Sequence, residues 1–224
     1  RIRDKNLIRG VGMAIMMQGS GIPLVDMGAA RVKLNDDGTF HLFIGATDIG
    51  TGSDTILAQI LAEEIGVPYE DIKVYSSDTD FTPFDTGAYA SSTTYISGGA
   101  VKRAGNEIKK KIIEYASKLM NENPDDLIIK DRNVVNINSG EKISLKEIGE
   151  RSFYDFKQEQ IEASASFVSP KSPPPFAAHF VLIDLDLETG QIIPVKYVAI
   201  NDIGIVIHPN LSKGQAIGSI VQGL

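Results

Sequence analysis

Residues 47–55 combine glycine, hydroxyl and carboxylate side chains at a point where a polar ligand could bind. The sequence there is Thr-Asp-Ile-Gly-Thr-Gly-Ser-Asp-Thr, which places Gly50 and Gly52 between an extended, β-patterned run and a helical run. Glycine permits positive φ and lets another molecule approach the backbone. A strand, a glycine-rich turn and a helix N-terminus together favour an anion, because N–H groups and the helix dipole attract negative charge. A plain tight turn is the alternative reading.

Residues 85–99 form a second stretch of small and hydroxyl side chains, Asp-Thr-Gly-Ala-Tyr-Ala-Ser-Ser-Thr-Thr-Tyr-Ile-Ser-Gly-Gly. Such a run offers many N–H groups and hydroxyls with little bulk, which suits a large phosphate-bearing ligand. It leads into a helix that we expect to begin near Ala100, a second N-terminus that favours an anion. A Ser/Thr-rich loop or edge strand explains the composition equally well, so the residues alone leave both readings open.

No local pattern of catalytic or metal-binding groups accompanies these stretches. His41, His179 and His208 have no carboxylate paired with them in sequence, and no His-x-x-x-His spacing occurs. The acids within residues 78–85 lack the glycine and terminal glutamate of an EF-hand loop. Cysteine is absent, which excludes disulfides, thiolate zinc sites and cysteine-ligated iron–sulfur clusters within this chain. The residues therefore predict a binding domain for a large anionic cofactor, and no reaction is visible in them.

Size and charge narrow the class of protein further. With 224 residues and 42% hydrophobic content, the chain can bury a sizeable core and form one large domain or two lobes. A net charge of −7 argues against nucleic acid as the main ligand. No apolar run approaches the roughly 20 residues of a membrane span, and no signal-peptide pattern follows the first residues. We therefore expect a soluble, cytoplasmic protein.

The glycine turn at residues 47–55 is expected to join a hairpin to a helix. Asn35-Asp36-Asp37-Gly38 is a strong hairpin signal, and Ser53 or Asp54 is the expected N-cap of the helix that Gly66 ends. The elements expected up to residue 76 are a buried strand within 9–21, strands at 27–34 and 39–44, a helix at 55–65 and a strand at 72–76.

Later segments follow the same mixed pattern. The proline-rich residues 169–176 cannot form a central strand or helix, so they indicate a linker or crossing loop. The elements expected before them are the helix from near Ala100 to Asn123-Pro124, a hairpin of strands 127–129 and 134–137, and a short helix that Ser144 caps.

An internal repeat is indicated by two hairpins that end alike. Strands at 179–187 and 192–200 lead to Asp202-Ile203-Gly204, as the earlier hairpin leads to Asp48-Ile49-Gly50. Each copy is followed by an apolar helix that contains glutamine. The repeat predicts two related half-sites that face one ligand from two sides.

At these residues the sequence resembles the molybdenum-cofactor-binding part of the xanthine dehydrogenase and aldehyde oxidase family, and within it the bacterial xanthine dehydrogenase-like molybdenum subunits. The resemblance covers nearly the whole chain in the family's order. The stretches that carry it are 9–14 (Arg-Gly-Val-Gly-Met-Ala), 48–66 (from Asp-Ile-Gly-Thr-Gly), 78–93 (with Gly-Ala-Tyr-Ala-Ser-Ser-Thr) and 202–224 (with Gly-Gln and a final Gln-Gly-Leu).

The resemblance implies where a cofactor and a substrate would lie. In that family the Gly-x-Gly turn and the Tyr/Ala-Ser run contact a molybdopterin that carries molybdenum and is commonly extended to a dinucleotide. Carried onto this sequence, the implied cofactor-binding residues are Gly50, Thr51, Gly52, Ser91, Ser92, Thr93 and Gln215, and the implied substrate-pocket residues are Tyr89 and Ala90. No protein side chain of this chain is expected to bind the metal directly.

The resemblance also implies a reaction and partners. Family members hydroxylate an electron-poor carbon with oxygen from water, and the electrons leave through iron–sulfur clusters to FAD or another acceptor. We expect a purine such as xanthine, or a related N-heterocycle, as the small-molecule substrate, with the iron–sulfur and FAD centres on partner subunits or domains. An aldehyde oxidase-like enzyme and a non-catalytic cofactor-binding or assembly module are the alternatives.

The sequence departs from the family at two points. Thr51 stands where the family usually has glutamine, so the side chain at that position is shorter and lacks an amide. The family's catalytic glutamate lies in a Gly-Glu-Pro-type motif beyond Leu224, so no catalytic residue is assigned within this chain. We therefore expect a fragment that needs the remainder of the molybdenum subunit, and we expect little molybdenum and no turnover from it alone.

The predicted fold is α+β, with two lobes of mixed β-sheet and packed helices. Residues 1–168 are assigned to the first lobe, and residues 169–224 to the linker and the start of a second lobe. The internal repeat places the cofactor at the lobe junction.

Overall fold

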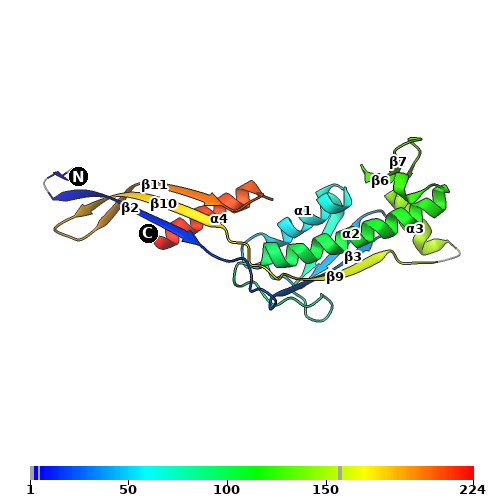
Figure 1. Cartoon of the computed structure of the whole chain (residues 1–224), viewed down its shortest axis with the longest axis horizontal. Helices are drawn as coiled ribbons and strands as arrows, with labels where there is room; N and C mark the ends of the chain where they lie inside the picture. The colour runs from blue at the N-terminus through cyan, green and yellow to red at the C-terminus, as the bar shows by residue number, and fades with distance from the viewer. Residues whose placement is uncertain (1–2, 5, 156–157) are drawn as a thin grey trace. The chain divides into compact units, whose positions relative to one another are not determined.

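A computed structural model describes residues 3–4, 6–155 and 158–224 (Figure 1). These residues form two compact units. Unit 1 contains residues 1–20 and 173–224, and unit 2 contains residues 21–172. The boundary between lobes that the sequence predicts lies at residue 169. The structure groups residues 169–172 with unit 2, and it groups the first twenty residues with the C-terminal part. The assignment of the two lobes as functional halves stays a prediction.

Unit 2 is built on a four-stranded sheet with the order β5-β4-β3-β9. Strands β3 (Met27–Leu34) and β4 (Phe40–Ile44) form the antiparallel hairpin that the sequence predicts, and the turn closes with Gly38 N donating to Asn35 O at 3.1 Å. Strand β9 (Glu162–Val168) pairs antiparallel with β3, and β5 (Ile72–Ser76) pairs parallel with β4. The parallel pair requires a crossover, which α1 supplies.

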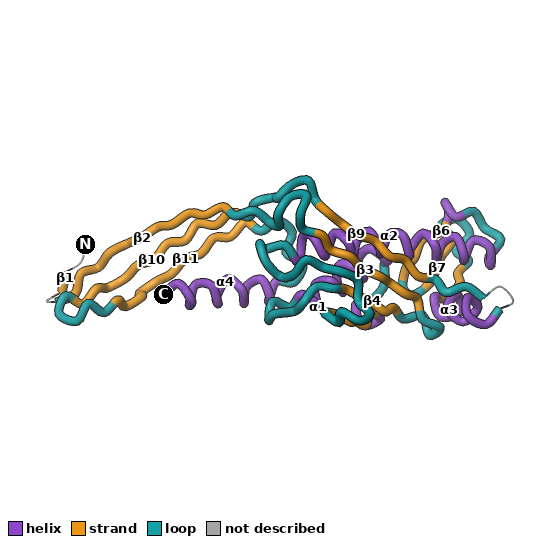
Figure 2. Tube along the Cα trace, turned by 90° about the horizontal axis from the view of Figure 1, so that it is seen from below, coloured by secondary structure: helices purple, strands orange, loops and turns teal. Residues whose placement is uncertain are grey.

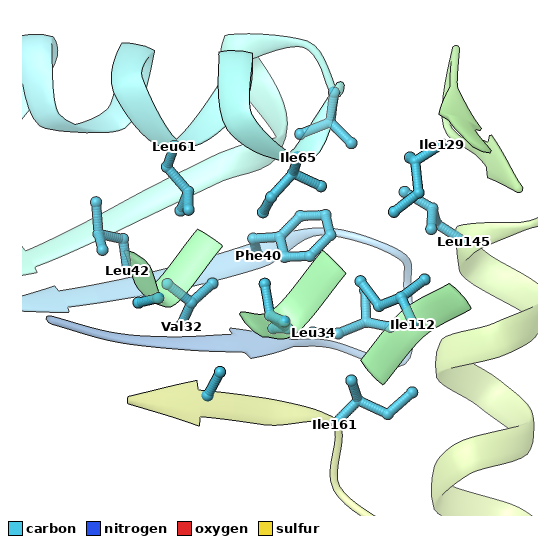
Figure 3. Packing of buried hydrophobic residues seen from close by; sticks show 14 of the residues in the cluster. Val32, Leu34, Phe40, Leu42, Leu61, Ile65, Ile112, Ile129, Leu145 and Ile161 are labelled. Atoms are coloured by element: carbon cyan, nitrogen blue, oxygen red, sulfur yellow. The ribbon is translucent and has the colours of Figure 1, made fainter. Parts of the chain in front are cut away.

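Alternate residues of the hairpin point into one core. Buried and half-buried positions alternate along β3, so that Val32 and Leu34 face the helices. Phe40 and Leu42 of β4 meet them there, with no exposed area, and Figure 3 shows these side chains beneath Leu61 of the first helix. Burying each such side chain contributes about 1.5 to 3 kcal/mol, so this face holds the sheet to the helices.

Helices α1 (Ser53–Ile65) and α2 (Thr93–Met120) cover that face of the sheet. The C-terminus of α1 is as predicted, because Gly66 adopts the left-handed conformation at φ +91°. The N-cap is Gly52, with no side-chain cap, so the prediction of Ser53 or Asp54 as cap is wrong. The predicted start of α2 near Ala100 is also wrong, because the run from Thr93 is already helical.

A small sheet extends the core of unit 2. Strands β6 (Leu127–Lys130), β7 (Asn133–Asn136) and β8 (Lys142–Ser144) are antiparallel, and their apolar residues join the same core cluster. Helix α3 (Leu145–Tyr154) follows, and Ser144 caps it by accepting from Glu147 N at 3.0 Å, as predicted. Short 3-10 helices at Tyr69–Asp71 and Pro124–Asp126 lead into β5 and β6.

Unit 1 is an antiparallel sheet with the order β1-β2-β10-β11 and one helix. Its strands are β1 (Arg3–Asp4), β2 (Leu7–Met17), β10 (Phe176–Asp186) and β11 (Ile192–Asp202), followed by α4 (Pro209–Gly223) (Figure 2). The prediction of a strand within residues 9–21 is confirmed, but the prediction that it is buried is wrong. Val11, Met13 and Ile15 are 75%, 67% and 76% exposed, because none of the described residues covers these side chains with a second layer.

Each unit contains one copy of the predicted repeat. In unit 2 the hairpin β3–β4 leads through Asp48-Ile49-Gly50 to α1, and in unit 1 the hairpin β10–β11 leads through Asp202-Ile203-Gly204 to α4. In both copies the aspartate accepts a hydrogen bond from the glycine N–H, at 2.8 Å for Gly50 and 3.2 Å for Gly204. Both glycines have positive φ, +96° and +71°. The repeat therefore extends to the hydrogen bonding of its turn.

Candidate functional site

The predicted site residues of unit 2 gather at one end of its helical layer. A Cβ on Gly98 of α2 would meet the side chain of Ile60 of α1, and a Cβ on Gly105 would meet Leu61 and Glu64. A later residue of α2 thus packs against later residues of α1. The two helices therefore run parallel, with their N-termini at the same end (Figure 1). The turn before α1 and the loop before α2 therefore lie at that common end, and the positive ends of both helix dipoles point toward it.

The glycine turn before α1 is occupied by a carboxylate of its own chain. Asp48 Oδ1 accepts from the backbone N–H groups of Gly50 at 2.8 Å and Gly52 at 3.1 Å. Gly52 also has positive φ, at +77°. We expected these two N–H groups to bind an anion of the ligand, but in this structure they bind the Asp48 carboxylate. A Cβ on Gly50 would meet no atom within 4 Å, so the outer face of the turn is open to another molecule.

We expect Asp48 to titrate below the ordinary aspartate pKa of 3.8. Burial alone would raise its pKa, but N–H groups of four residues, Gly50 and Gly52 foremost, outweigh burial and lower it. The ionised carboxylate therefore stabilises the turn at pH values above the ordinary pKa. This stabilisation is lost as the pH falls through the lowered pKa of the folded protein. Carbon NMR titration of the Asp48 carboxyl checks this, with Asp48→Asn to assign the signal. A pKa at or above 3.8 would contradict the hydrogen bonding described.

The loop before α2 holds two adjacent residues in the left-handed conformation. Ala90 has φ +50° and Ser91 has φ +55°, and neither is glycine. Such residues cost on the order of 1 kcal/mol each and persist where the surroundings fix them. Ser92 is 3% exposed and its hydroxyl donates to Tyr89 O at 2.7 Å. In this structure Ser92 therefore braces the loop, and its predicted contact with a cofactor stays a prediction.

Asp85 ties the same loop to the first turns of α2. Its Oδ1 accepts from Gly87 N at 2.9 Å, and its Oδ2 accepts from the hydroxyl of Ser97 at 2.6 Å. Ser97 is buried within the helix. Thr93, the first residue of α2, is half-buried at the helix start, and Ser91, two residues earlier, is exposed. The loop and the helix N-terminus therefore form one connected structure.

Residues 21–27, which we name the bracket segment, hold this loop from outside. Gly21 N donates to Ala90 O at 2.8 Å, and Thr86 N donates to Met27 O at 3.2 Å. Asp26 is fully buried, and its Oδ1 accepts from the Tyr89 hydroxyl at 2.7 Å. This hydrogen bond raises the pKa of the Tyr89 phenol above its ordinary value. Sequence reasoning missed Asp26, although an aspartate within the apolar run Ile-Pro-Leu-Val-Asp-Met is a usable signal.

Helix α1 contains buried polar side-chain atoms that form no hydrogen bond with the described residues. Ser53 Oγ, Asp54 Oδ1 and Gln59 Oε1 are buried and have no hydrogen-bond partner in the part of the chain that the structure describes. Neither α1 nor α2 has a side-chain N-cap, whereas Ser144 caps α3 and His208 caps α4. Of the three atoms, only the Ser53 hydroxyl can donate to an anion, because Asp54 Oδ1 and Gln59 Oε1 are acceptors. The feature of this end that fits an anionic ligand is therefore the pair of helix N-termini without side-chain caps.

A shallow groove of about 680 Å³ lies elsewhere, on the sheet face that the helices leave open. Its lining includes Arg31 of β3 and Ser164 of β9, together with Asp80 and Thr82 of the loop after β5. Arg31 lies over the ring of Phe43, with 4.4 Å between its Cζ and the ring centroid. None of the predicted site residues lines this groove.

Gln215 lies in unit 1, near the middle of α4, and is exposed. It does not open the helix, because α4 begins at Pro209, whose fixed φ suits a first helical position. Its predicted contact with the cofactor stays a prediction.

His41 and His179 contact aromatic side chains within their own sheets. His41 of β4 stacks edge-on against Tyr75, with ring centroids 5.1 Å apart, and burial followed by nearby Lys33 and Lys73 lowers its pKa. His179 lies 2.9 Å from the Tyr197 hydroxyl through Nδ1.

Over residues 3–4, 6–155 and 158–224, no cluster of three or more histidine or acidic side chains could hold a metal ion. Within the same ranges no helix combines the length and apolar character that crossing a membrane requires.

The fold and this site are those of an α+β domain with an open glycine turn and two helix N-termini that suit a large anionic group. Among known protein families, the model of the molybdopterin cofactor-binding domain matches residues 1–224 of this chain. The chain therefore belongs to the molybdopterin cofactor-binding domain family.

Relatives in sequence are large molybdenum proteins. A probable hypoxanthine oxidase of Escherichia coli strain K12 is 34% identical over 215 residues, which cover 96% of this chain and 22% of the relative. A putative xanthine dehydrogenase molybdenum-binding subunit of the same strain is 34% identical over 225 residues, which cover 98% of this chain and 30% of the relative. The chain thus spans less than a third of the length of these relatives.

Solved structures show the same fold. The Cu,Mo-CO dehydrogenase matches with a TM-score of 0.87 at 25% identity, over 96% of this chain and 29% of that chain. The aldehyde oxidoreductase of Desulfovibrio desulfuricans matches with a TM-score of 0.74 at 22% identity, over 98% of this chain and 23% of that chain, which indicates a shared fold.

Proposed function

We propose that this chain is the part of a molybdenum hydroxylase that binds the molybdopterin, and that the whole protein oxidises a purine such as xanthine or hypoxanthine with oxygen from water. The observation that carries the proposal is the common end of unit 2. There the open Gly50 turn, the strained Tyr89–Ser92 loop and two N-termini without side-chain caps lie together. The purine is inferred from the names of the two Escherichia coli relatives.

The residues of this chain are suited to binding and orienting a cofactor. Thr51 carries a hydroxyl group within the turn, and a Cβ added at Gly50 would meet no atom within 4 Å, so another molecule can approach the backbone there. Thr93 begins α2, where the helix dipole favours a negative group. The cofactor, when bound, supplies the redox chemistry of the hydroxylation. The protein's part is to hold the cofactor and to shape the space beside it.

The substrate pocket is proposed to lie at Tyr89 and Ala90. Tyr89 is 43% exposed, and its hydroxyl is fixed by a buried carboxylate, so its ring presents a defined surface to an incoming molecule. Ala90 has a small side chain, and its backbone is fixed by Gly21. Partner subunits or domains that carry iron–sulfur clusters and FAD complete the proposed electron path, since this chain has no cysteine to ligate a cluster.

An aldehyde substrate is the second candidate, since an aldehyde oxidoreductase shares the fold. A cofactor-binding module without catalysis is the third, because no catalytic residue is assigned among the described residues of unit 2. The assay below separates all three.

The test uses the full-length protein that contains this chain. Molybdenum is measured by elemental analysis, and reduction of an artificial electron acceptor is followed with xanthine, hypoxanthine and benzaldehyde. Stoichiometric molybdenum with purine-dependent reduction is the expected result. Reduction by benzaldehyde alone would select the aldehyde reading, and molybdenum without any turnover would select the module. A well-folded protein without molybdenum or pterin would contradict the proposed function.

A pair of glycine variants tests the binding surface itself. Gly50→Val fills the open outer face of the turn and should at least halve the molybdenum content, since a lost cofactor contact is worth about 1 kcal/mol or more. Gly190→Val is the matched control. Gly190 also has positive φ, +75°, and also meets no atom within 4 Å, so the variant carries the same kind of backbone strain. Equal molybdenum loss in both variants would contradict a specific role for the Gly50 turn.

A further inference from the structure

The buried carboxylate of Asp26 has no role in the reaction proposed above, yet it lies directly behind the proposed substrate pocket. Its relative exposure is 0%, and ionisable groups are rarely buried so completely without paired hydrogen bonds. Oδ1 accepts from the Tyr89 hydroxyl at 2.7 Å, and Oδ2 accepts from Ile22 N at 2.7 Å. One side chain therefore joins the bracket segment to the pocket loop through both of its oxygens.

The loop that Asp26 holds needs external support. Ala90 and Ser91 both adopt positive φ, which non-glycine residues disfavour, so the loop would relax if it were released. The support is continuous along the bracket segment, because Gly21 N donates to Ala90 O and Thr86 N donates to Met27 O. A Cβ on Gly21 would lie 3.1 Å from Ile96 of α2, which shows how closely the bracket segment is packed.

We propose that Asp26 is a positioning residue of the substrate pocket: through Tyr89 and Ile22 it fixes the orientation of the Tyr89 ring and the left-handed conformation at Ala90 and Ser91. This inference rests on the proposed function, since it assigns the pocket to this loop. Asp26 does not touch the substrate. It acts by keeping the loop in one geometry, so that binding does not require the loop to be ordered.

The carboxylate is suited to this position in a way that an amide is not. Both donors, an O–H and an N–H, point at the two oxygens, and a carboxylate is an acceptor at both. Asparagine has one acceptor oxygen and one donor group. Asp26→Asn can therefore keep the hydrogen bond from Ile22 N, but its amide can meet the phenol only by donating to the Tyr89 oxygen, which reverses that hydrogen bond and removes the charge from the acceptor. Asp26→Ala removes both. The expected order of disturbance is therefore Ala above Asn above the unchanged protein.

The kinetic test uses the full-length protein with xanthine as the probe, or hypoxanthine if only that substrate is turned over. Asp26→Ala and Tyr89→Phe should each raise KM about tenfold, in line with loss of a hydrogen bond to a charged group. Molybdenum content should stay unchanged. The double variant should be no worse than Asp26→Ala, because both changes break the same contact. A multiplicative loss, or an unchanged KM in Tyr89→Phe, would overturn the inference.

A matched control is available on the surface of the same unit. Tyr154 donates to Asp36 Oδ2 at 3.1 Å, so Tyr154→Phe removes a tyrosine–aspartate hydrogen bond remote from the proposed pocket. We expect no change in KM for this variant. A KM change of the same size as in Tyr89→Phe would show that the effect is not specific to the pocket, and would overturn the inference.

A second measurement keeps the inference testable if the protein holds no molybdenum. Hydrogen exchange of backbone amides at residues 85–92 and at Gly21 should speed up in Tyr89→Phe and Asp26→Asn, which are mild enough to fold. It should stay unchanged in Tyr154→Phe. Unchanged exchange at Gly21 and residues 85–92 in both Asp26→Asn and Tyr89→Phe would overturn the positioning role. Absence of molybdenum would overturn the proposed function alone, so the two failures are distinguishable.

Discussion

Gly28→Ala should destabilise unit 2 by roughly 1 to 3 kcal/mol, the range for forcing extra atoms into a packed interior. A Cβ at Gly28 in β3 would lie 2.8 Å from Ser97 Cα, 3.0 Å from Ser97 N and 3.1 Å from Ile96 O. All three atoms are helix backbone of α2, which cannot rotate away as a side chain can. The methyl group therefore has to push the first turns of α2 off the sheet.

The displacement should also reach the proposed site. Ser97 donates to Asp85, which in turn accepts from Gly87 in the pocket loop, so a shift of α2 pulls on the loop. We expect a lower midpoint of urea or thermal unfolding together with a lower molybdenum content in the full-length protein.

Gly10→Ala is the matched control for this prediction. Gly10 also lies in an antiparallel strand, β2, and a Cβ there would meet no atom within 4 Å. The control should leave the unfolding midpoint within experimental error. An equal midpoint for Gly28→Ala and Gly10→Ala would show that β3 and α2 are not packed as closely as described.

Local patterns in the sequence predicted most of the elements that position the site. The hairpin turn at Asn35–Gly38, the end of α1 at Gly66 and the Ser144 cap of α3 each depend on residues within a few positions of one another, so the sequence displays them directly. The family resemblance then supplied what local patterns could not, namely the molybdopterin.

The wrong predictions involve groups that act over longer distances or compete locally. Gly52, and not Ser53, is the N-cap of α1, because Asp48 four residues earlier already binds the turn N–H groups. Helix α2 begins early because Ser97 in its first turns is paired with Asp85, which offsets the weak helix propensity of the Ser/Thr/Gly run. Neither contact follows from periodicity.

Asp26 escaped sequence reasoning for a related reason. Its partner Tyr89 lies 63 positions away, so no spacing rule connects them. The exposure of β2 escaped it as well, because an apolar run predicts burial without saying which layer provides it. Both cases show that contacts between distant segments, not element types, were the missing information.

Ala90→Leu should raise the KM of the full-length protein for its substrate about 100-fold, equivalent to about 2.8 kcal/mol, and should leave the molybdenum content unchanged. Ala90 is proposed to form a wall of the pocket, and leucine adds three carbon atoms there. The loop cannot yield, because Ala90 O is bound by Gly21 N and the neighbouring Tyr89 is held by Asp26. The added side chain therefore occupies substrate space.

Ala90→Gly separates occupied space from backbone strain. Glycine accepts the φ of +50° at this position without penalty and adds no atoms, so KM should stay within about twofold of the unchanged protein. If strain and not space controlled binding, glycine would change KM as strongly as leucine. Normal KM in Ala90→Leu would place the pocket elsewhere, whereas loss of molybdenum in that variant would move Ala90 from the substrate wall to the cofactor contacts. Measuring molybdenum and KM on the same preparations of both variants distinguishes these outcomes, because a wall residue changes the second quantity alone.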